Sequence, residues 1–344
     1  MSLPAAPHSI DDAGVPRFGT YQGTLDAVAL DALRGEYQPS ATRRLLTRKK
    51  WVYGFVATRE VAAMMAVVDV GYTSNAFTMA VDLGSGRVLA DAGFLGLPRP
   101  LVTVGDRPGA GLEASFRRPD AQLAVSRPFG DERYHFHVHV GLPLLSKLSC
   151  SFDLLAAGAS PPLTVVAPVE GGIVNVTHKW AGLLGFGRLE AGGRSYLLDG
   201  GVGGLDYTQG YLARRTAWRW AFACGRLEDG APVGLNLVEG FNESRDDVNE
   251  NAVWLGGQLW PVGRARFTWN KADPLERWSV ETTDGALKLS FKPIAAHREH
   301  LDLKLVRSLF VQPMGLWEGT ITVGGRTYPV KDLPGVAEDQ DVLW

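Results

Sequence analysis

The segment from Thr177 to Trp254 concentrates side chains that could carry out acid–base chemistry. The ionisable and amide side chains in this segment include His178, Lys179, Asp206, Arg219, Glu239, Asn242, Glu250 and Asn251. They alternate with tryptophan and leucine inside a run of apparent β-structure. Burying so many polar groups is costly unless they are paired or hydrated. We therefore expect them to line a cavity, either inside a β-barrel or between two β-domains.

Asp206 is the first candidate for a catalytic acid, with Glu239 and His178 as further catalytic candidates. An acid that protonates an alkene must keep its proton near pH 7, and burial or a second carboxylate raises a carboxyl pKa. Glu239 or Glu250 could be that second carboxylate. The structural alternative is that Asp206 binds a backbone turn or pairs with a cation, which would be Lys179, Arg214 or Arg219.

Aromatic side chains of the same segment could enclose an apolar molecule and stabilise developing positive charge. Together with the polar groups they define a set of expected ligand contacts. These are Lys179, Tyr207, Trp218, Arg219, Trp220, Asn242, Glu250, Asn251 and Trp254.

Strand alternation divides residues 215–224 into two faces. Trp218, Trp220 and their neighbours share one face, which we expect to be core. The other face carries small residues and one large polar side chain, Arg219. This composition is typical of a packed or ligand-lined surface. Because a buried arginine usually finds a carboxylate, we expect Arg219 to pair with Glu239 or Glu250 more readily than to clamp a substrate.

Three histidines, His135, His137 and His139, share one face of a predicted strand. Neighbouring pairs could chelate a metal, but along a straight strand the three span about 13 Å and cannot meet one ion. We expect an exposed polar face and no metal. The sequence contains no nucleophile-elbow or phosphate-loop motif, and Gly200–Gly204 does not lead from a strand into a helix, so we expect no cofactor.

Composition excludes other classes of function. A net charge of −2 and a pI near 6.4 give no reason to expect nucleic acid as a partner. The basic cluster at residues 43–50 is typical of a solvated connection before a strand, with an anion site as the alternative. No apolar run is long enough to span a bilayer, and no signal peptide is evident. With only Cys150 and Cys224, we expect a cytoplasmic protein with reduced thiols and Cys224 in the core.

The elements that must position these residues are overwhelmingly β-strands. Short runs rich in Val, Thr, Tyr, Phe and Trp recur between glycine-bearing turns, as in sandwiches and barrels. One helix is expected at residues 25–35, and residues 57–68 are ambiguous. We expect two closely packed domains, residues 18–212 and residues 213–344, because no flexible linker separates them.

Several segments resemble a bacterial family catalogued as domain of unknown function 2804. They include KKWVYGFVATRE, VTHKWAGLLGFGRLE, LDYTQGYLARRTAWRWA, LVRSLFVQPMGLWEG and the closing GVAEDQDVLW. The pattern is more distantly similar to carotenoid hydratase and AttH-like proteins. The segments of this chain that correspond to the motifs of those proteins are Gly187–Leu189, Leu205–Tyr207, Trp218–Trp220, Asp229–Gly230 and Trp317–Gly319. Residues 206–210 depart from the hydratases, which carry a histidine- or arginine- and tryptophan-containing extension there.

This resemblance implies an all-β protein of two lipocalin-like antiparallel β-barrel domains packed side by side. It also implies a small, largely apolar ligand, such as an isoprenoid-, lipid- or polyketide-like molecule. We expect a pocket with cofactor-independent lyase, isomerase, hydratase or cyclase chemistry. A non-catalytic lipid or metabolite carrier is the alternative, and a structural protein without a ligand is a third. A pair of carboxylates deep in the pocket would favour the enzyme. A smooth apolar pocket would favour the carrier. The sequence leaves the oligomeric state open.

Overall fold

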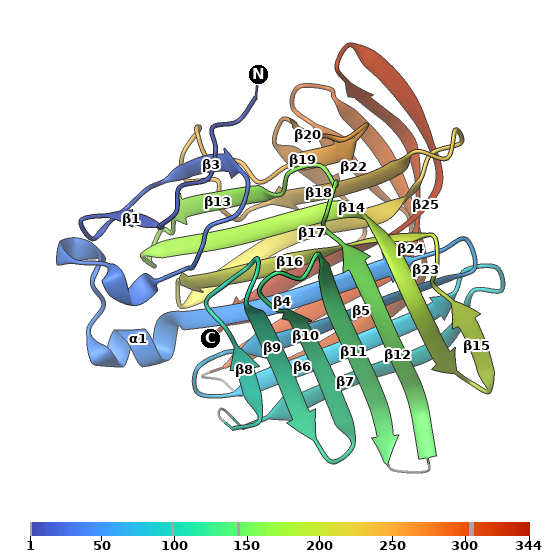
Figure 1. Ribbon diagram of the computed structural model, residues 1–344, viewed down its shortest axis with the longest axis horizontal. Coiled ribbons are helices and arrows are strands. Elements are labelled where there is room, and N and C mark those ends of the chain that lie inside the picture. The colour runs from blue at the N-terminus through green and yellow to red at the C-terminus, as the bar shows by residue number, and fades with distance from the viewer. Residues whose placement is uncertain (1, 98–99, 143–144, 303–305) are drawn as a thin grey trace.

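The protein is almost entirely β-structure (Figure 1). The computed structural model describes residues 2–97, 100–142, 145–302 and 306–344. In these ranges the helical elements are α1 (Ala41–Thr47) and two 3-10 turns, η1 (Leu30–Ala32) and η2 (Gly35–Tyr37). No helix in the described part of the chain is long and apolar enough to cross a bilayer. The expected all-β fold is confirmed.

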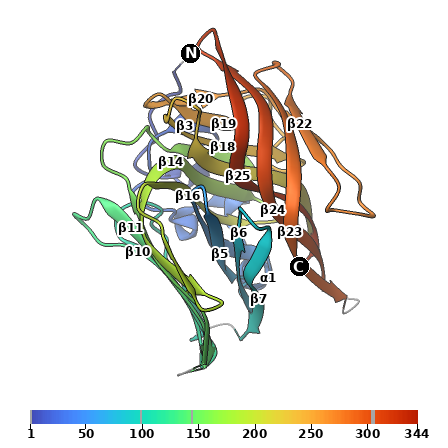
Figure 2. The same cartoon turned by 90° about the vertical axis from the view of Figure 1, so that its right-hand side faces the viewer.

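The described strands form two large antiparallel sheets, barrel-like in shape and packed side by side (Figures 1 and 2). The first, here called the N-terminal sheet, has the order β7-β6-β5-β4-β16-β14-β12-β11-β10-β9-β8, with β13, β15 and β3 attached beside β14 and β13. Its strands are β3 (Gly19–Gln22), β4 (Arg48–Ala57), β5 (Val61–Asp69), β6 (Ser74–Asp82), β7 (Arg87–Gly96), β8 (Val102–Val104), β9 (Leu112–Arg118), β10 (Ala121–Arg127), β11 (Arg133–Leu142), β12 (Leu145–Leu155), β13 (Leu163–Pro168), β14 (Val174–Ala191), β15 (Arg194–Leu197) and β16 (Gly201–Tyr211).

The second, here called the C-terminal sheet, has the order β20-β19-β18-β17-β25-β24-β23-β22-β21. Its strands are β17 (Arg215–Arg226), β18 (Pro232–Glu239), β19 (Ala252–Leu255), β20 (Gln258–Pro261), β21 (Ala265–Thr268), β22 (Trp278–Thr282), β23 (Leu287–Asp302), β24 (Arg307–Val323) and β25 (Arg326–Leu343). A separate ribbon pairs β1 (Asp11–Asp12) with β2 (Val15–Pro16). The chain passes from one large sheet to the other between β16 and β17.

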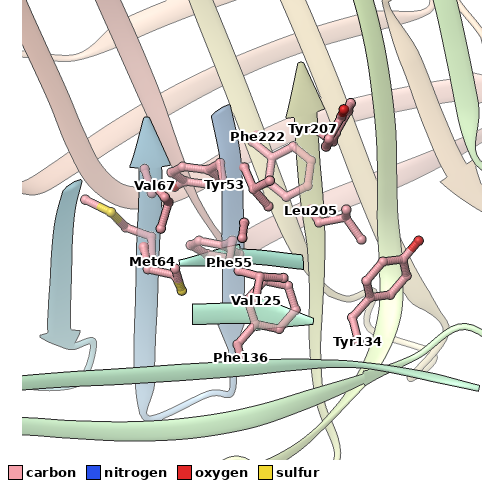
Figure 3. Close-up of a cluster of buried hydrophobic side chains, with 14 of the residues drawn as sticks. Tyr53, Phe55, Met64, Val67, Val125, Tyr134, Phe136, Leu205, Tyr207 and Phe222 are labelled. Carbon is pink, nitrogen blue, oxygen red and sulfur yellow. The ribbon is translucent and has the colours of Figure 1, made fainter. Parts of the chain in front are cut away.

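The N-terminal sheet curls so that its two halves face each other across a hydrophobic core (Figure 3). On β4, Val52 and Gly54 point into this core, and a side chain at Gly54 would collide with the Phe136 ring of β11. Tyr53 and Phe55 point to the other face of β4 because side chains alternate along a strand. Both rings lie against Phe222 of β17, each with a centroid separation of 6.3 Å. The outer face of β4 is therefore covered by the C-terminal sheet.

Two local predictions are wrong. The helix expected at residues 25–35 is mostly irregular, because tertiary hydrogen bonds replace helical ones: Val28 N–H donates to the Asp106 carbonyl (2.6 Å). The basic cluster is not simply solvated. Lys49 and Lys50 are buried at the start of β4, and Lys49 Nζ donates to the carbonyls of Leu46 (2.6 Å) and Val70 (2.9 Å). The segment at residues 57–68, whose structure the sequence left ambiguous, forms the last residue of β4, a turn and most of β5.

Gly234 of β18 lies at a close approach of the two sheets. A Cβ atom there would lie 2.5 Å from Ala181 Cβ and closer still to the Gly182 nitrogen of β14. We expect Gly234→Ala to lower the free energy of unfolding by about 1–3 kcal/mol, the usual cost of overpacking. Urea unfolding would measure this. Gly84→Ala is the matched control, because its Cβ would meet only Asp82 Oδ1, at 3.6 Å. Equal effects at both sites would contradict the tight packing.

Candidate functional site

A cavity of about 460 Å³ lies between the two sheets. Its first wall is a row of paired residues across the N-terminal sheet. The row runs through Lys179 (β14), Asp206 (β16), Tyr53 (β4), Ala66 (β5) and Phe77 (β6). Since directly paired residues project from the same face of a sheet, all five side chains point toward the C-terminal sheet.

The opposite wall is built in the same way from the C-terminal sheet. Trp218 (β17), Gln340 (β25), Phe310 (β24) and Glu299 (β23) form one row. Glu338 is paired with Trp220 in the next row. All of these side chains line the cavity.

Aromatic pairs hold the two walls together at the sides of the cavity. The ring of Trp51 stacks on Trp218 with centroids 6.0 Å apart, and Tyr53 meets Trp220 edge-on at 5.0 Å. Farther along, Phe77 stacks on the His297 imidazole at 5.0 Å. Between these contacts β5 contributes the small side chain of Ala66 to the wall. The cavity is therefore a slot with mainly aromatic and aliphatic walls.

A buried ionic cluster closes one end of the slot. Lys179 Nζ lies 2.8 Å from Asp206 Oδ2 and 3.5 Å from Glu250 Oε2. Asp206 also accepts hydrogen bonds from Trp51 Nε1–H (3.2 Å) and the Thr208 hydroxyl (3.1 Å). Burial raises the pKa of Glu250, and the ammonium of Lys179 opposes that shift. One cation thus holds two carboxyl groups at the cavity wall.

Glu338 is a third carboxyl group at the cavity and has a different environment. Its Oε1 accepts from Trp218 Nε1–H (2.6 Å) and its Oε2 from the Gln312 amide (2.5 Å). Burial raises the pKa of Glu338 to about 7, although both hydrogen bonds oppose the shift. At neutral pH a large fraction of Glu338 therefore carries a proton, whereas Asp206 is held in an ion pair.

His297 of β23 lies toward the other end of the slot. Its Nδ1 is 2.5 Å from Asp91 Oδ1 of β7, and its Nε2 is 3.5 Å from Glu299 Oε1. Glu299 Oε2 also accepts from the Asn75 amide (2.7 Å). Burial disfavours the charged imidazole, but the bonds to the two carboxylates outweigh it and raise the pKa of His297 to about 9. These contacts connect the two sheets through a buried imidazolium.

His297 should make stability depend on pH. Its pKa is raised in the folded state, so its contribution is complete below pH 6.5 and is lost as the pH rises through about 9. We expect wild type to lose about 3 kcal/mol of this contribution across that range. His297→Gln should lack the loss. Urea unfolding of both proteins at several pH values would test it. The difference between them is the relevant quantity, because Lys49, whose pKa burial lowers to about 7, gives an opposite slope. If the stabilities of wild type and His297→Gln changed equally with pH, the raised pKa of His297 would be contradicted.

The catalytic candidate Asp206 and several of the expected ligand contacts do meet at this cavity. Those on its wall are Lys179, Asp206, Trp218, Trp220 and Glu250. Asn242 lies behind Glu250 and donates its amide N–H to Glu250 Oε1 (2.9 Å). Of the alternatives for Asp206, the ion pair with Lys179 is present.

His178 and Tyr207 do not face the cavity, which corrects their expected place in the site. Each is adjacent in sequence to a cavity residue, Lys179 or Asp206, so strand alternation turns it to the opposite face, into the N-terminal sheet. Tyr207 donates its hydroxyl to the Gly105 carbonyl (2.9 Å). Burial lowers the pKa of His178 to about 3, which makes it a neutral core side chain.

Arg219 and Glu239 also lie away from the cavity, as an ion pair with atoms 3.3 Å apart. This is the structural pair predicted for Arg219. The expected core face of β17 is confirmed, because Trp220, Phe222 and Cys224 lie in the hydrophobic core. Trp218 and Trp220 on this face also border the cavity, and Ala221 and Ala223 of the other face pack in the core of the C-terminal sheet. The remaining expected contacts support the backbone instead: Trp254 Nε1–H donates to Pro161 O (3.0 Å), and Asn251 Oδ1 accepts from Val238 N–H (2.6 Å).

Sequence reasoning did not single out Glu338, His297 or Glu299. A signal was present for Glu338, because residues 336–342 of the closing GVAEDQDVLW alternate with Glu338, Gln340 and Val342 on one face. Such a polar face in a strand rich in buried residues is typical of a cavity wall. His297 gave no comparable local signal, because its partner Asp91 is more than 200 residues away in the sequence.

The three-histidine strand is β11. His135 lies between Asp131 (2.9 Å) and Asp153 (2.8 Å), and His137 contacts the Ser151 hydroxyl (3.0 Å). Within the described residues, no group of three or more His, Cys, Asp or Glu side chains is arranged to hold a metal ion.

The fold and the site define an all-β protein with a ligand-sized cavity between two barrel-like sheets. The chain belongs to the family described as domain of unknown function (DUF2804), whose model matches residues 7–344. A search of curated proteins gives no match.

Solved structures of similar architecture share little sequence with the chain. An AttH protein of Nitrosomonas europaea is 12% identical and covers 86% of this chain and 92% of its own, with a TM-score of 0.47. CghA with Sch210972 is 13% identical and covers 95% and 99%, with a TM-score of 0.48. Kievitone hydratase from Nectria haematococca is 11% identical and covers 95% and 98%, with a TM-score of 0.46.

Proposed function

We propose that the protein binds a small, largely apolar molecule between its two sheets and acts on it by acid–base catalysis without a cofactor. The observation that carries this proposal is Glu338, a carboxyl group with a pKa of about 7 on an otherwise mainly apolar wall. A general acid is most effective when its pKa lies near the working pH. The proposed ligand class is isoprenoid-, lipid- or polyketide-like, and the proposed site of action is the cytoplasm.

In the proposed mechanism Glu338 supplies the proton. Its O–H bond breaks while a new C–H bond forms at an alkene carbon of the substrate, which leaves positive charge on the neighbouring carbon. The faces of Trp51 and Trp218 stabilise that charge. In hydration a water molecule then adds to the cation and releases a proton, which restores Glu338. In isomerisation the cation instead loses a proton from an adjacent carbon. In cyclisation a second double bond attacks the cation, and the new ring cation then loses a proton in the same way. In both cases Asp206 accepts the proton, and exchange with water returns a proton to Glu338.

The environments of Asp206 and Glu338 support this division of roles. Two carboxyl groups at one site can serve as acid and base when their surroundings separate their protonation states. Asp206 is paired with Lys179 at 2.8 Å, whereas no cation lies within 4 Å of Glu338 in the described part of the chain. Asp206 is therefore the proposed acceptor for a proton that leaves the substrate.

A carrier without catalytic activity is the second candidate. The aromatic and aliphatic walls of the slot would suit storage or transport of an apolar molecule equally well. Of the carboxyl groups at the cavity, the three buried ones, Asp206, Glu250 and Glu338, favour the enzyme, because a carrier of apolar molecules does not require buried acids.

The two candidates can be separated by incubating the purified protein with a lipid extract of its own cells in D₂O. We expect wild type to enrich one component and to return it with deuterium on carbon or with the mass of added water, as mass spectrometry would show. Ala66→Phe, which fills the slot, should neither enrich nor convert that component. Enrichment without any chemical change would support the carrier. Equal enrichment by Ala66→Phe would place binding outside the cavity.

A further inference from the structure

The slot has a second polar end that the proposed reaction does not use. Glu299 lies on its wall, and its side chain is 23% exposed, compared with 7% or less for Asp206 and Glu250. It is therefore the most accessible of these carboxylates to a molecule in the cavity. The hydrogen bond from Asn75 (2.7 Å) and the contact with His297 (3.5 Å) fix its position.

The separation of the two ends follows from the sheet register. His297, Gln312 and Glu338 lie side by side on β23, β24 and β25, and Glu299 is two residues beyond His297 on β23. Two strand spacings across and two residues along place the backbones of Glu338 and Glu299 about 12 Å apart. Phe77 and Phe310 line the intervening wall. The site is therefore an apolar channel with a carboxyl group at each end.

The balance of charge determines which polar group suits the Glu299 end. The Lys179 ammonium is already paired with Asp206, and the His297 imidazolium is already paired with Asp91. His297 carries one positive charge but contacts two carboxylates, Asp91 and Glu299, so the negative charge of Glu299 is not fully neutralised. An ionised carboxylate can only accept hydrogen bonds. Arg298 and His300 also border the cavity, but both are exposed on alternate positions of β23, and neither forms an ion pair with Glu299 within 4 Å. A hydroxyl or ammonium group is favoured here, and a second carboxylate is repelled.

We propose that Glu299 binds a hydrogen-bond-donating group, an amine or a hydroxyl, at one end of an elongated apolar ligand whose other end reaches Glu338. This inference rests on the proposed function and specifies its ligand class. It distinguishes the site from one for fatty acids, whose carboxylate would have to lie beside Glu299 or Glu338.

Displacement of the neutral fluorescent probe N-phenyl-1-naphthylamine by three molecules of equal chain length tests the proposal. They are decylamine, decan-1-ol and decanoate. Near neutral pH we expect wild type to bind the amine most tightly and the carboxylate at least about tenfold more weakly, as for charge-assisted hydrogen bonds. Glu299→Gln should remove most of the preference for amine over alcohol. Glu318→Gln, an exposed change of the same charge outside the cavity, should retain it.

Four other outcomes would contradict the role of Glu299, and one of them would also contradict the proposed function. Equal affinity of wild type for all three molecules would overturn the role of Glu299 but leave an apolar cavity intact. Preference for decanoate would also overturn it. Loss of the amine preference in Glu338→Gln but not in Glu299→Gln would place the donor at the acid end and contradict the proposal. Failure of the fluorescent probe itself to bind would overturn the proposed function together with this inference.

Discussion

Replacing Lys179 with methionine should lower the free energy of unfolding by about 3–5 kcal/mol at pH 7, the usual cost of removing one partner of a buried ion pair. Lys179 is the only cation within 4 Å of both Asp206 and Glu250 among the described residues. Methionine would fill a similar volume but leave the two buried carboxyl groups without a counter-charge. Urea unfolding monitored by tryptophan fluorescence would measure the effect. It should shrink at lower pH as Glu250, whose pKa burial raises, takes up a proton.

Three comparisons make this result specific. The combined variant Lys179→Met, Asp206→Asn, Glu250→Gln should recover most of the lost stability, because no buried charge remains. Asp206→Asn alone should cost less than Lys179→Met, since Glu250 stays 3.5 Å from the ammonium. Lys271→Met removes an exposed lysine and should cost less than about 1 kcal/mol. A loss below that value for Lys179→Met would show that the cluster is hydrated and not buried.

Glu338→Gln should lower turnover about 10²- to 10⁴-fold while the fold and ligand binding persist, because glutamine has the same shape but no acidic proton. The amide can still accept from Trp218 or Gln312, which keeps the local packing. The measurement is the rate at which wild type and variant convert the molecule identified in the D₂O experiment. Full activity of Glu338→Gln would remove Glu338 from the mechanism.

The same variant should change the pH dependence of stability. The Glu338 carboxyl has a pKa of about 7 in the folded protein and an ordinary value of 4.5 when unfolded. Between these values the folded state holds more protons, so wild type should lose about 3 kcal/mol as the pH rises from 4.5 through 7. Glu338→Gln should not show this loss. The exposed control Glu318→Gln should retain it. Unfolding curves across this pH range would decide, and identical slopes for wild type and Glu338→Gln would contradict the raised pKa.

The sequence by itself determined the β-class of the fold and the faces of its strands. Glycine-bearing turns between Val-, Tyr- and Trp-rich runs predict strands through local chemistry alone. Alternation already required that Lys179 and His178 lie on opposite faces, as do Asp206 and Tyr207. The pairing of Arg219 with Glu239 was also predictable, because these residues belong to consecutive strands joined by a hairpin.

Only the tertiary structure decided which of these faces meets the cavity. A period of two shows which side chains share a face but not what packs against that face. The tryptophan face of β17 lies in the core as expected, but Trp218 and Trp220 on that face also border the slot, which alternation alone could not show. Glu338 and Asp206 come together only because β25 and β16 belong to opposing sheets. His297 and Asp91, separated by 206 positions, meet for the same reason. Burial then sets the pKa of Glu338, and burial is a property of the packed sheets that no local sequence contains.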